Sequence, residues 1–176
     1  HFRQPGANAS EEVESGTRAA AHGGYGTVAL MPNTEPAADN VETLQAAIAG
    51  ERHGVRLLPI AAATVGRAGA QVSDVAALVK AGAVAISDDG SPIADRAIFR
   101  AALLAAAAAG IPLIEHCEEP TLTAGGEAAD GIVASRLGLR PWPAAGELRA
   151  VESAIAVLRD VVASAPTARL HLTNLS

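Results

Sequence analysis

Short apolar segments alternate with helix-forming segments along the whole chain, and this alternation constrains the fold more than any other feature. Gly, Pro or Asp bounds each apolar segment, which is typical of buried strands. A strand–helix–strand order predicts parallel strands joined by right-handed crossovers, in an α/β fold. The predicted strands are residues 26–31, 56–63, 83–87, 111–115 and 169–173.

The segments between the strands carry the start and stop signals of helices. Ser, Asp and Asn precede them and Gly follows them, as N-caps and C-caps do. The predicted helices begin near Ser10, Asn40, Ser73, Ile93 and Glu147. The Gly- and Pro-rich segment 118–143 is predicted to be a loop at one rim of the sheet. Two architectures remain, an open doubly wound sheet and a (β/α)8 barrel. No dinucleotide-binding or Walker glycine motif follows a strand, which disfavours a nucleotide-binding function.

Composition and charge exclude several function classes. The chain has 13 basic and 19 acidic residues and a net charge of −6, without a block of like charges, which argues against a nucleic acid or a membrane as partner. The longest apolar run, 101–114, is too short to span a bilayer. Cys117 is the only cysteine, which suits a cytoplasmic protein. Because the chain begins at His1 and stops just after a predicted strand, we expect it to be truncated at both ends.

Polar residues follow the predicted strands at the ends where the strands finish. In a parallel barrel these ends meet on one face, and active sites lie there. A single His after a strand is usually structural, and Asp-Asp-Gly is a common turn, so the prediction depends on their joint occurrence. His nitrogen and carboxylate oxygen are ligands of zinc, so the pattern predicts a metal site. The residues that follow predicted strands are Asn33, Thr64, Asp88, Asp89, His116 and Asn174, and His1 and Arg3 open the chain.

Lysine gives a useful negative observation. Some binuclear zinc barrels bridge their metals with a carboxylated lysine at the end of a strand. The only lysine here is Lys80, which precedes a predicted strand and therefore lies at its wrong end. If two metals are bridged, an aspartate must bridge them, and Asp89 is the candidate.

At these residues the chain resembles dihydroorotases of the long bacterial type, within the amidohydrolase superfamily. The resemblance extends over residues 1–176 and implies a partial (β/α)8 TIM barrel of the metal-dependent hydrolase type, the central part of a single barrel domain. The segments that carry it are 1–6, 15–21, 31–34, 87–90, 115–118, 137–139 and 143–147.

The resemblance implies a cytoplasmic enzyme of de novo pyrimidine biosynthesis that interconverts N-carbamoyl-L-aspartate and dihydroorotate, with one or two zinc ions per full-length chain. It implies that His1 is the second His of an H-x-H metal-binding pair. Asp89 would be the catalytic carboxylate that bridges the metals, and His116 a ligand of the second. Arg3 and Asn33 would hold the substrate's carboxylate, which Arg can bind bidentately. The family's general base, an Asp on the last barrel strand, lies outside this chain.

The last predicted strand departs from the family's pattern. His171 matches a non-ligand histidine, but Asn174 stands where the family has a zinc-binding histidine. A neutral amide oxygen is a poor zinc donor beside imidazole, so the resemblance predicts a weakened second metal site. The alternative is a non-catalytic scaffold that binds aspartate transcarbamoylase. Hydantoinases and allantoinases are a third possibility, disfavoured because Asp88-Asp89 replaces their bridging lysine.

Overall fold

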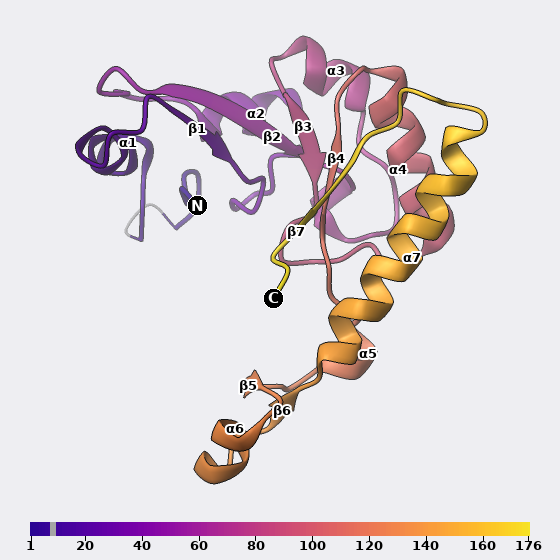
Figure 1. The fold of residues 1–176 in the computed structure, drawn as a ribbon. Helices are drawn as coiled ribbons and strands as arrows, with labels where there is room; N and C mark the ends of the chain where they lie inside the picture. Colours follow the sequence, from indigo (N-terminus) through magenta and orange to yellow (C-terminus); the bar gives the residue numbers. More distant parts are fainter. Residues whose placement is uncertain (8–9) are drawn as a thin grey trace.

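The computed structural model describes residues 1–7 and 10–176. Its centre is a parallel sheet with the strand order β1-β2-β3-β4-β7 (Figure 1). All five predicted strands are confirmed as neighbours in this sheet. Their order follows the chain without the reversal that marks a doubly wound sheet, which favours part of a barrel. The strands are β1 (Thr27–Leu30), β2 (Arg56–Ala62), β3 (Ala85–Ser87), β4 (Leu113–His116) and β7 (Leu170–Thr173).

Four of the five N-caps lie within two residues of the predicted helix starts, and one of them, Asn40, is the predicted residue itself. The side chains of Asn40, Asp74 and Asp95 each accept a hydrogen bond from a backbone N–H of the first turn. The last helix begins earlier than predicted, directly after Pro143, whose φ of −69° already suits a helix start. The helices are α1 (Val13–His22), α2 (Val41–Ala47), α3 (Val75–Lys80), α4 (Arg96–Ala108) and α7 (Ala144–Val162).

Small side chains allow the helices to pack closely on one face of the sheet. Helices α3, α4 and α7 lie on the same side of the strands in Figure 1. Ala102 and Ala106 of α4 are fully buried together with Leu103 and with Leu113 of β4. Each buried leucine contributes about 1.5–3 kcal/mol to stability. This core fixes the strands, and therefore the polar residues that follow them.

The first residues of the chain are held against α1 and α2. Gly16 of α1 allows the ring of Phe2 to approach, because a Cβ atom at this position would lie 2.1 Å from a ring carbon. Gln4 donates a hydrogen bond from Nε2 to the carbonyl of Ala49 over 2.7 Å. These contacts fix the segment that carries the predicted site residues His1 and Arg3.

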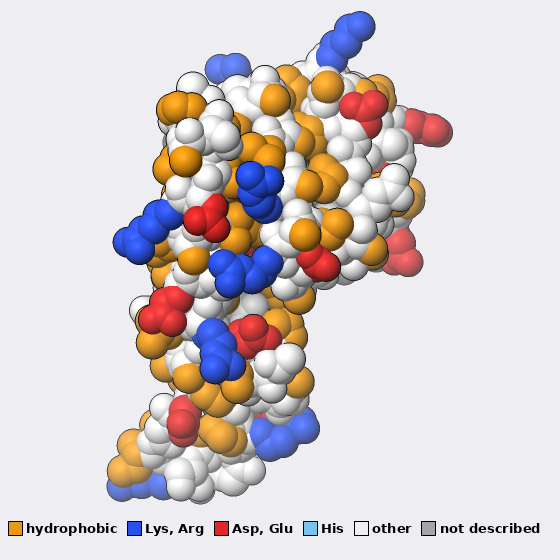
Figure 2. Space-filling view, turned by 90° about the vertical axis from the view of Figure 1, so that its right-hand side faces the viewer, with side chains coloured by type: hydrophobic (Ala, Val, Ile, Leu, Met, Phe, Trp, Pro, Cys, Tyr) orange, Lys and Arg blue, Asp and Glu red, His pale blue; other side chains and the backbone are white. Residues whose placement is uncertain are grey.

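Segment 118–143 was predicted to be a loop, and the structure corrects this prediction in part. It contains α5 (Pro120–Thr123), β5 (Ala128–Ala129), α6 (Ile132–Leu137) and β6 (Pro141–Trp142), with β5 and β6 paired in parallel. Strands of two residues are too short to show the alternation that predicts a strand. The segment projects away from the sheet in Figure 1 and forms the narrow lower part of Figure 2.

Acidic and basic side chains are interspersed on the face shown in Figure 2, with apolar atoms between them. Neither sign of charge dominates this face, which lies on the side of α4 and α7 in Figure 1. Among the helices that the structure describes, none combines the length and the apolar character that a membrane crossing requires.

Candidate metal centre and active site

The register of the sheet places Asp89 beside His116. Ser87 of β3 pairs with Ile114 of β4, and Asp89 and His116 each follow two residues later. Side chains two residues apart in a strand share a face. The carboxylate and the imidazole therefore meet at the C-terminal end of the sheet, with 3.4 Å between Asp89 Oδ1 and His116 Nδ1.

His1 approaches the same carboxylate from the other side. Its Nε2 atom lies 3.7 Å from Asp89 Oδ2, so each carboxylate oxygen faces a different imidazole. Two ligands of one tetrahedral zinc, each with a bond of about 2.0–2.1 Å, lie about 3.4 Å apart. The separations on both sides of Asp89 are close to this value, which is the arrangement expected of a bridging carboxylate.

Asn33 determines which nitrogen of His1 faces the carboxylate. Asn33 Nδ2 donates to Asp89 Oδ2 over 3.2 Å, so Asn33 Oδ1 is left to accept the 3.0 Å hydrogen bond from His1 Nδ1. In neutral His1 the other nitrogen, Nε2, then has a lone pair directed at an anionic oxygen. Two electron-rich atoms face each other, and a cation between them would relieve this repulsion.

A bound cation would also be favourable next to His116. Its Nδ1 atom is buried, and the described residues give it no hydrogen-bond partner although Asp89 Oδ1 is near. A buried polar atom without a partner carries a desolvation cost, which a metal ligand bond would offset. Glu118 Oε2 lies 3.5 Å from the other ring nitrogen, Nε2. Sequence reasoning did not assign Glu118 a role, although its position two residues after His116 was a signal.

The donor set fits zinc on both sides of Asp89, but it is incomplete on each. Zinc sites in proteins have at least three protein ligands. Over residues 1–7 and 10–176, no group of three or more His, Cys, Asp or Glu side chains is close enough to hold one ion. His1 with Asp89, and Asp89 with His116, are therefore two pairs that share one carboxylate. Lys80 ends α3, before β3 begins, and so lies at the other end of the strand from Asp89.

Arg3 lies beside Asn33, the other predicted substrate-binding residue. Arg3 Nη1 donates to the backbone carbonyl of Asn33 over 3.1 Å. Both residues line a cleft of about 390 Å³ together with Thr34 and Arg67. The guanidinium has further donors for a carboxylate in this cleft.

Thr64 and Asp88, two other polar residues at strand ends, support the site instead of facing it. The Thr64 amide donates to Asp88 Oδ1 over 3.0 Å, and the Thr64 hydroxyl donates to Asp88 Oδ2. Burial raises the pKa of the Asp88 carboxyl, and the hydrogen bonds from Thr64 oppose that rise. The pair joins the end of β2 to the end of β3, directly before Asp89.

Asn174 follows β7 on the same rim. His116 and Asn174 both line a cavity of about 500 Å³, which the projecting segment closes on one side. Asn174 has a φ of +60°, a conformation that asparagine tolerates better than most residues. Its Oδ1 accepts a hydrogen bond from the Thr173 hydroxyl over 3.0 Å. The structure thus places Asn174 on the side of His116, where the sequence predicts a missing ligand.

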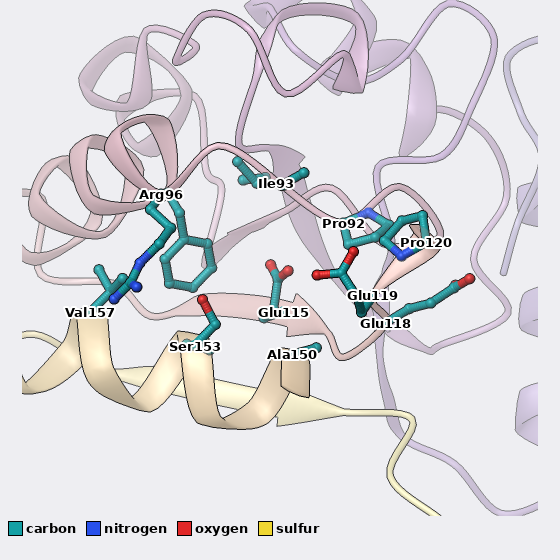
Figure 3. Close-up of a pocket in the computed structure, with 13 residues that line it drawn as sticks. Pro92, Ile93, Arg96, Glu115, Glu118, Glu119, Pro120, Ala150, Ser153 and Val157 are labelled. Carbon is teal, nitrogen blue, oxygen red and sulfur yellow. The ribbon is translucent and has the colours of Figure 1, made fainter. Parts of the chain in front are cut away.

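Glu115 is an ionisable residue in the apolar layer between the sheet and the helices. Figure 3 shows its side chain directed from β4 into the space between α4 and α7, toward Ile93. It is only 6% exposed, and it lines a small cavity of about 50 Å³ with Arg96 and Ser153. Burial, together with the nearby Asp88 carboxylate, raises the pKa of Glu115 to about 8. Sequence reasoning gave Glu115 no role of its own.

Cys117 is buried beside this layer. Burial raises the pKa of its thiol to about 11, and nearby carboxylates add to the effect. A thiol with such a pKa is almost fully protonated at neutral pH and is a weak nucleophile. The cysteine is therefore a poor candidate for a nucleophile, although it lines the same cavity as His116 and Asn174.

Comparison with known protein families gives a match over nearly the whole chain. The family model described as dihydro-orotase-like matches residues 1–175. Dihydroorotases from Bacillus caldolyticus and Geobacillus kaustophilus are each 43% identical to the chain over 180 residues, and one from Pelotomaculum thermopropionicum is 40% identical over 178. Each match includes 100% of this chain and 40% of the relative. The chain thus spans about 40% of the length of these curated relatives.

A solved structure supports the fold. The L-hydantoinase (dihydropyrimidinase) from Arthrobacter aurescens superposes with a TM-score of 0.62 over 89% of this chain and 35% of its own, at 16% sequence identity. At this identity the likeness concerns the fold alone. Together with the sequential strand order, it identifies the sheet as part of a (β/α)8 barrel.

Proposed function

Because the chain belongs to the dihydro-orotase-like family, we propose that the full-length protein is a zinc-dependent hydrolase of cyclic amides that interconverts dihydroorotate and N-carbamoyl-L-aspartate. The carrying observation is the Asp89 carboxylate between the imidazoles of His1 and His116. Arg3 and Asn33, which would anchor the substrate, lie next to this carboxylate. This combination fits a small anionic substrate with a hydrolysable amide.

His1, Asp89 and His116 would hold the metal, with further ligands from outside this chain. Bound zinc activates water near neutral pH and polarises a carbonyl group. Asp89 would contribute to both metal positions, so it is the residue on which the site depends most. By accepting from Nδ1, Asn33 would favour the neutral tautomer of His1 that has its lone pair on Nε2, which is the form that binds metal.

Arg3 and Asn33 would orient the substrate. Donors of the Arg3 guanidinium that do not contact the Asn33 carbonyl can receive the carboxylate of carbamoyl aspartate. Anchoring that carboxylate fixes the distance between the reacting amide and Asp89, and such positioning is a large part of catalysis. The proton to the leaving nitrogen would pass through a base outside this chain.

The family's role in de novo pyrimidine biosynthesis, in the cytoplasm, is part of the same proposal. The alternative is a scaffold that binds aspartate transcarbamoylase without catalysis. The site geometry favours the enzyme, because His1, Asp89, His116, Arg3 and Asn33 stand together at one rim. A chain with only a scaffolding role would have no need to keep this arrangement.

Ring opening of dihydroorotate by the purified full-length protein tests the proposal. We expect turnover that a chelator abolishes and zinc restores, and we expect His116→Ala to lower it strongly. His22→Ala is the matched control, because His22 is an exposed residue in the last turn of α1. Absence of turnover in the zinc-loaded protein, together with binding of aspartate transcarbamoylase, would establish the scaffold function instead.

The Arg3→Lys variant tests the anchoring role. Lysine keeps the charge but loses the fork that binds a carboxylate bidentately. A charge-assisted hydrogen bond contributes about 1.5–3 kcal/mol, so we expect kcat/KM for carbamoyl aspartate to fall by about 10-fold to 100-fold. The measurement is steady-state kinetics of ring closure, with Arg52→Lys as a control at an exposed position. Unchanged KM and kcat in the Arg3→Lys variant would refute the role.

The Asn174→His variant tests the second metal position. The amide of Asn174 is a poor zinc donor, so we expect one tightly bound zinc per full-length chain, on the side of His1, and reduced hydrolase activity. An imidazole at position 174 should add a second tight zinc beside His116 and raise kcat. Metal analysis after dialysis and steady-state kinetics give both results. Two tight zinc ions in the unsubstituted protein would show that Asn174 does not limit metal binding.

A further inference from the structure

The turn after β2 is held in a conformation that is unfavourable for one of its residues. Gly66 has a φ of +60° and Arg67 a φ of +55°. Glycine adopts this region freely, but an arginine rarely does. The turn is fixed from both sides, because the Gly66 amide donates to Asp39 Oδ2 over 2.7 Å and the Gly69 amide donates to Thr64 Oγ1 over 2.9 Å. A non-glycine residue kept in a fixed, strained turn points to a use for its side chain.

The side chain of Arg67 reaches from this turn to the turn that carries Asp89. Its Nη2 donates to the backbone carbonyl of Asp89 over 2.6 Å and to Ser91 Oγ over 3.0 Å. Among the side-chain hydrogen bonds of the described residues, these two are the only ones that join residues 89–91 to the turn after β2. The carboxylate of Asp89 is on the same residue as the bound carbonyl, so the guanidinium restrains the position of that carboxylate.

We propose that Arg67 is a positioning residue that clamps the Asp89–Ser91 turn, and so holds the Asp89 carboxylate between His1 and His116. The inference rests on the proposed function for its effect on turnover, but the clamp itself is a property of the fold. Ser87 Oγ accepts from the Asp89 amide over 3.0 Å, and Ser91 donates its amide to the Asp88 carbonyl over 2.7 Å. Arg67 adds the contacts that join residues 89–91 to the turn after β2.

A direct role in substrate binding is the competing explanation. Arg67 lines the same cleft as Arg3 and Asn33, so its guanidinium is near the expected position of the substrate's carboxylate. However, its Nη2 atom is already engaged by Asp89 and Ser91. A positioning residue affects mainly kcat and metal affinity, whereas a residue that binds substrate equally in the ground and transition states affects mainly KM.

The Arg67→Gly variant isolates the side chain from the backbone. Glycine relieves the positive φ, and the amide of residue 67 can still donate to the Thr64 carbonyl. The variant should therefore keep the backbone conformation of the turn while it loses the hydrogen bonds of the side chain. Arg67→Lys keeps the charge with a different donor geometry. Arg52→Gly is the control, because Arg52 Nη2 also donates to a backbone carbonyl, that of Ile48, but before β2 begins.

In the full-length protein we expect Arg67→Gly to lower kcat and zinc affinity by about 10-fold to 100-fold, the usual effect of losing support around metal ligands. KM should change little, Arg67→Lys should recover part of the loss, and added guanidinium ions should partly restore kcat in the glycine variant. Amide hydrogen exchange should become faster at Asp89 and Ser91, whose amides are hydrogen-bonded in this turn, and stay unchanged in α4. Arg52→Gly should show none of these effects.

The outcomes distinguish a positioning role of Arg67 from substrate binding, and they distinguish a failure of the clamp from a failure of the proposed function. A rise in KM with an unchanged kcat would show that Arg67 binds substrate, and unchanged kinetics with unchanged exchange would remove its role altogether. If the unsubstituted protein does not open dihydroorotate, the proposed function fails, and the clamp is then judged by exchange alone. Unaltered exchange at Asp89 and Ser91 in Arg67→Gly would overturn the clamp in that case too.

Discussion

Replacing Asp89 with asparagine is expected to lower kcat/KM for dihydroorotate by about 1,000-fold or more, and to remove tightly bound zinc. Asparagine has the same shape and can still accept the hydrogen bond from Asn33 Nδ2, but it lacks the negative charge that two metal positions would share. Metal ions supply several kcal/mol of transition-state stabilisation, and each 1.4 kcal/mol is a factor of ten in rate. Kinetics and metal analysis of the full-length variant measure both effects.

Asp74→Asn is the matched control for this substitution. Asp74 caps α3 by accepting from the Ala77 amide, and asparagine is an equally good N-cap. The control variant should keep its metal and its activity. An Asp89→Asn protein that retained full zinc content and turnover would show that the metal is bound elsewhere.

Replacing Glu115 with glutamine is expected to stabilise the protein at alkaline pH. The pKa of Glu115 is raised from 4.5 to about 8 in the folded chain, chiefly by burial. Between these values the unfolded chain releases a proton that the folded chain retains, so stability falls as pH rises through this window and levels off above pH 8. One pKa unit corresponds to about 1.4 kcal/mol, so the loss is about 5 kcal/mol at most and smaller where water reaches the cavity.

Glutamine is nearly the same size as Glu115 and cannot ionise, so the variant should lose this pH dependence. Its free energy of unfolding should match that of the parent near pH 4 and exceed it near pH 8. Denaturant unfolding of the full-length protein across this range measures the difference. Parallel pH profiles for the two proteins would show that the Glu115 carboxyl ionises normally in the folded state.

Sequence patterns predicted the strands and the face of the site because these depend on local periodicity. Once strands are parallel, residues such as Asn33, Asp89 and His116 that follow them must meet at one rim. The distances between their side chains needed the register of β3 against β4, which the sequence alone does not specify. The resemblance to dihydroorotases added roles to these residues, and the structure supplies a geometry in which those roles are possible.

Other features of the structure could not be predicted from the sequence, for physical reasons. The role of Arg67 depends on a positive φ and on the reach of a long side chain to the next strand. Glu115 breaks the rule that strands covered by helices are apolar, and nothing in the sequence shows that its side chain faces α4 and α7. The short strands β5 and β6 carry too few residues for any periodicity.

Anomalous diffraction at the zinc absorption edge, from crystals of the full-length protein, tests the central claim most directly. The account predicts a strong zinc peak at bonding distance, about 2 Å, from both His1 Nε2 and an oxygen of Asp89. It also predicts a weaker peak or none beside His116. A well-ordered protein whose zinc lies elsewhere, with the carboxylate of Asp89 free of metal, would contradict the assignment of this site.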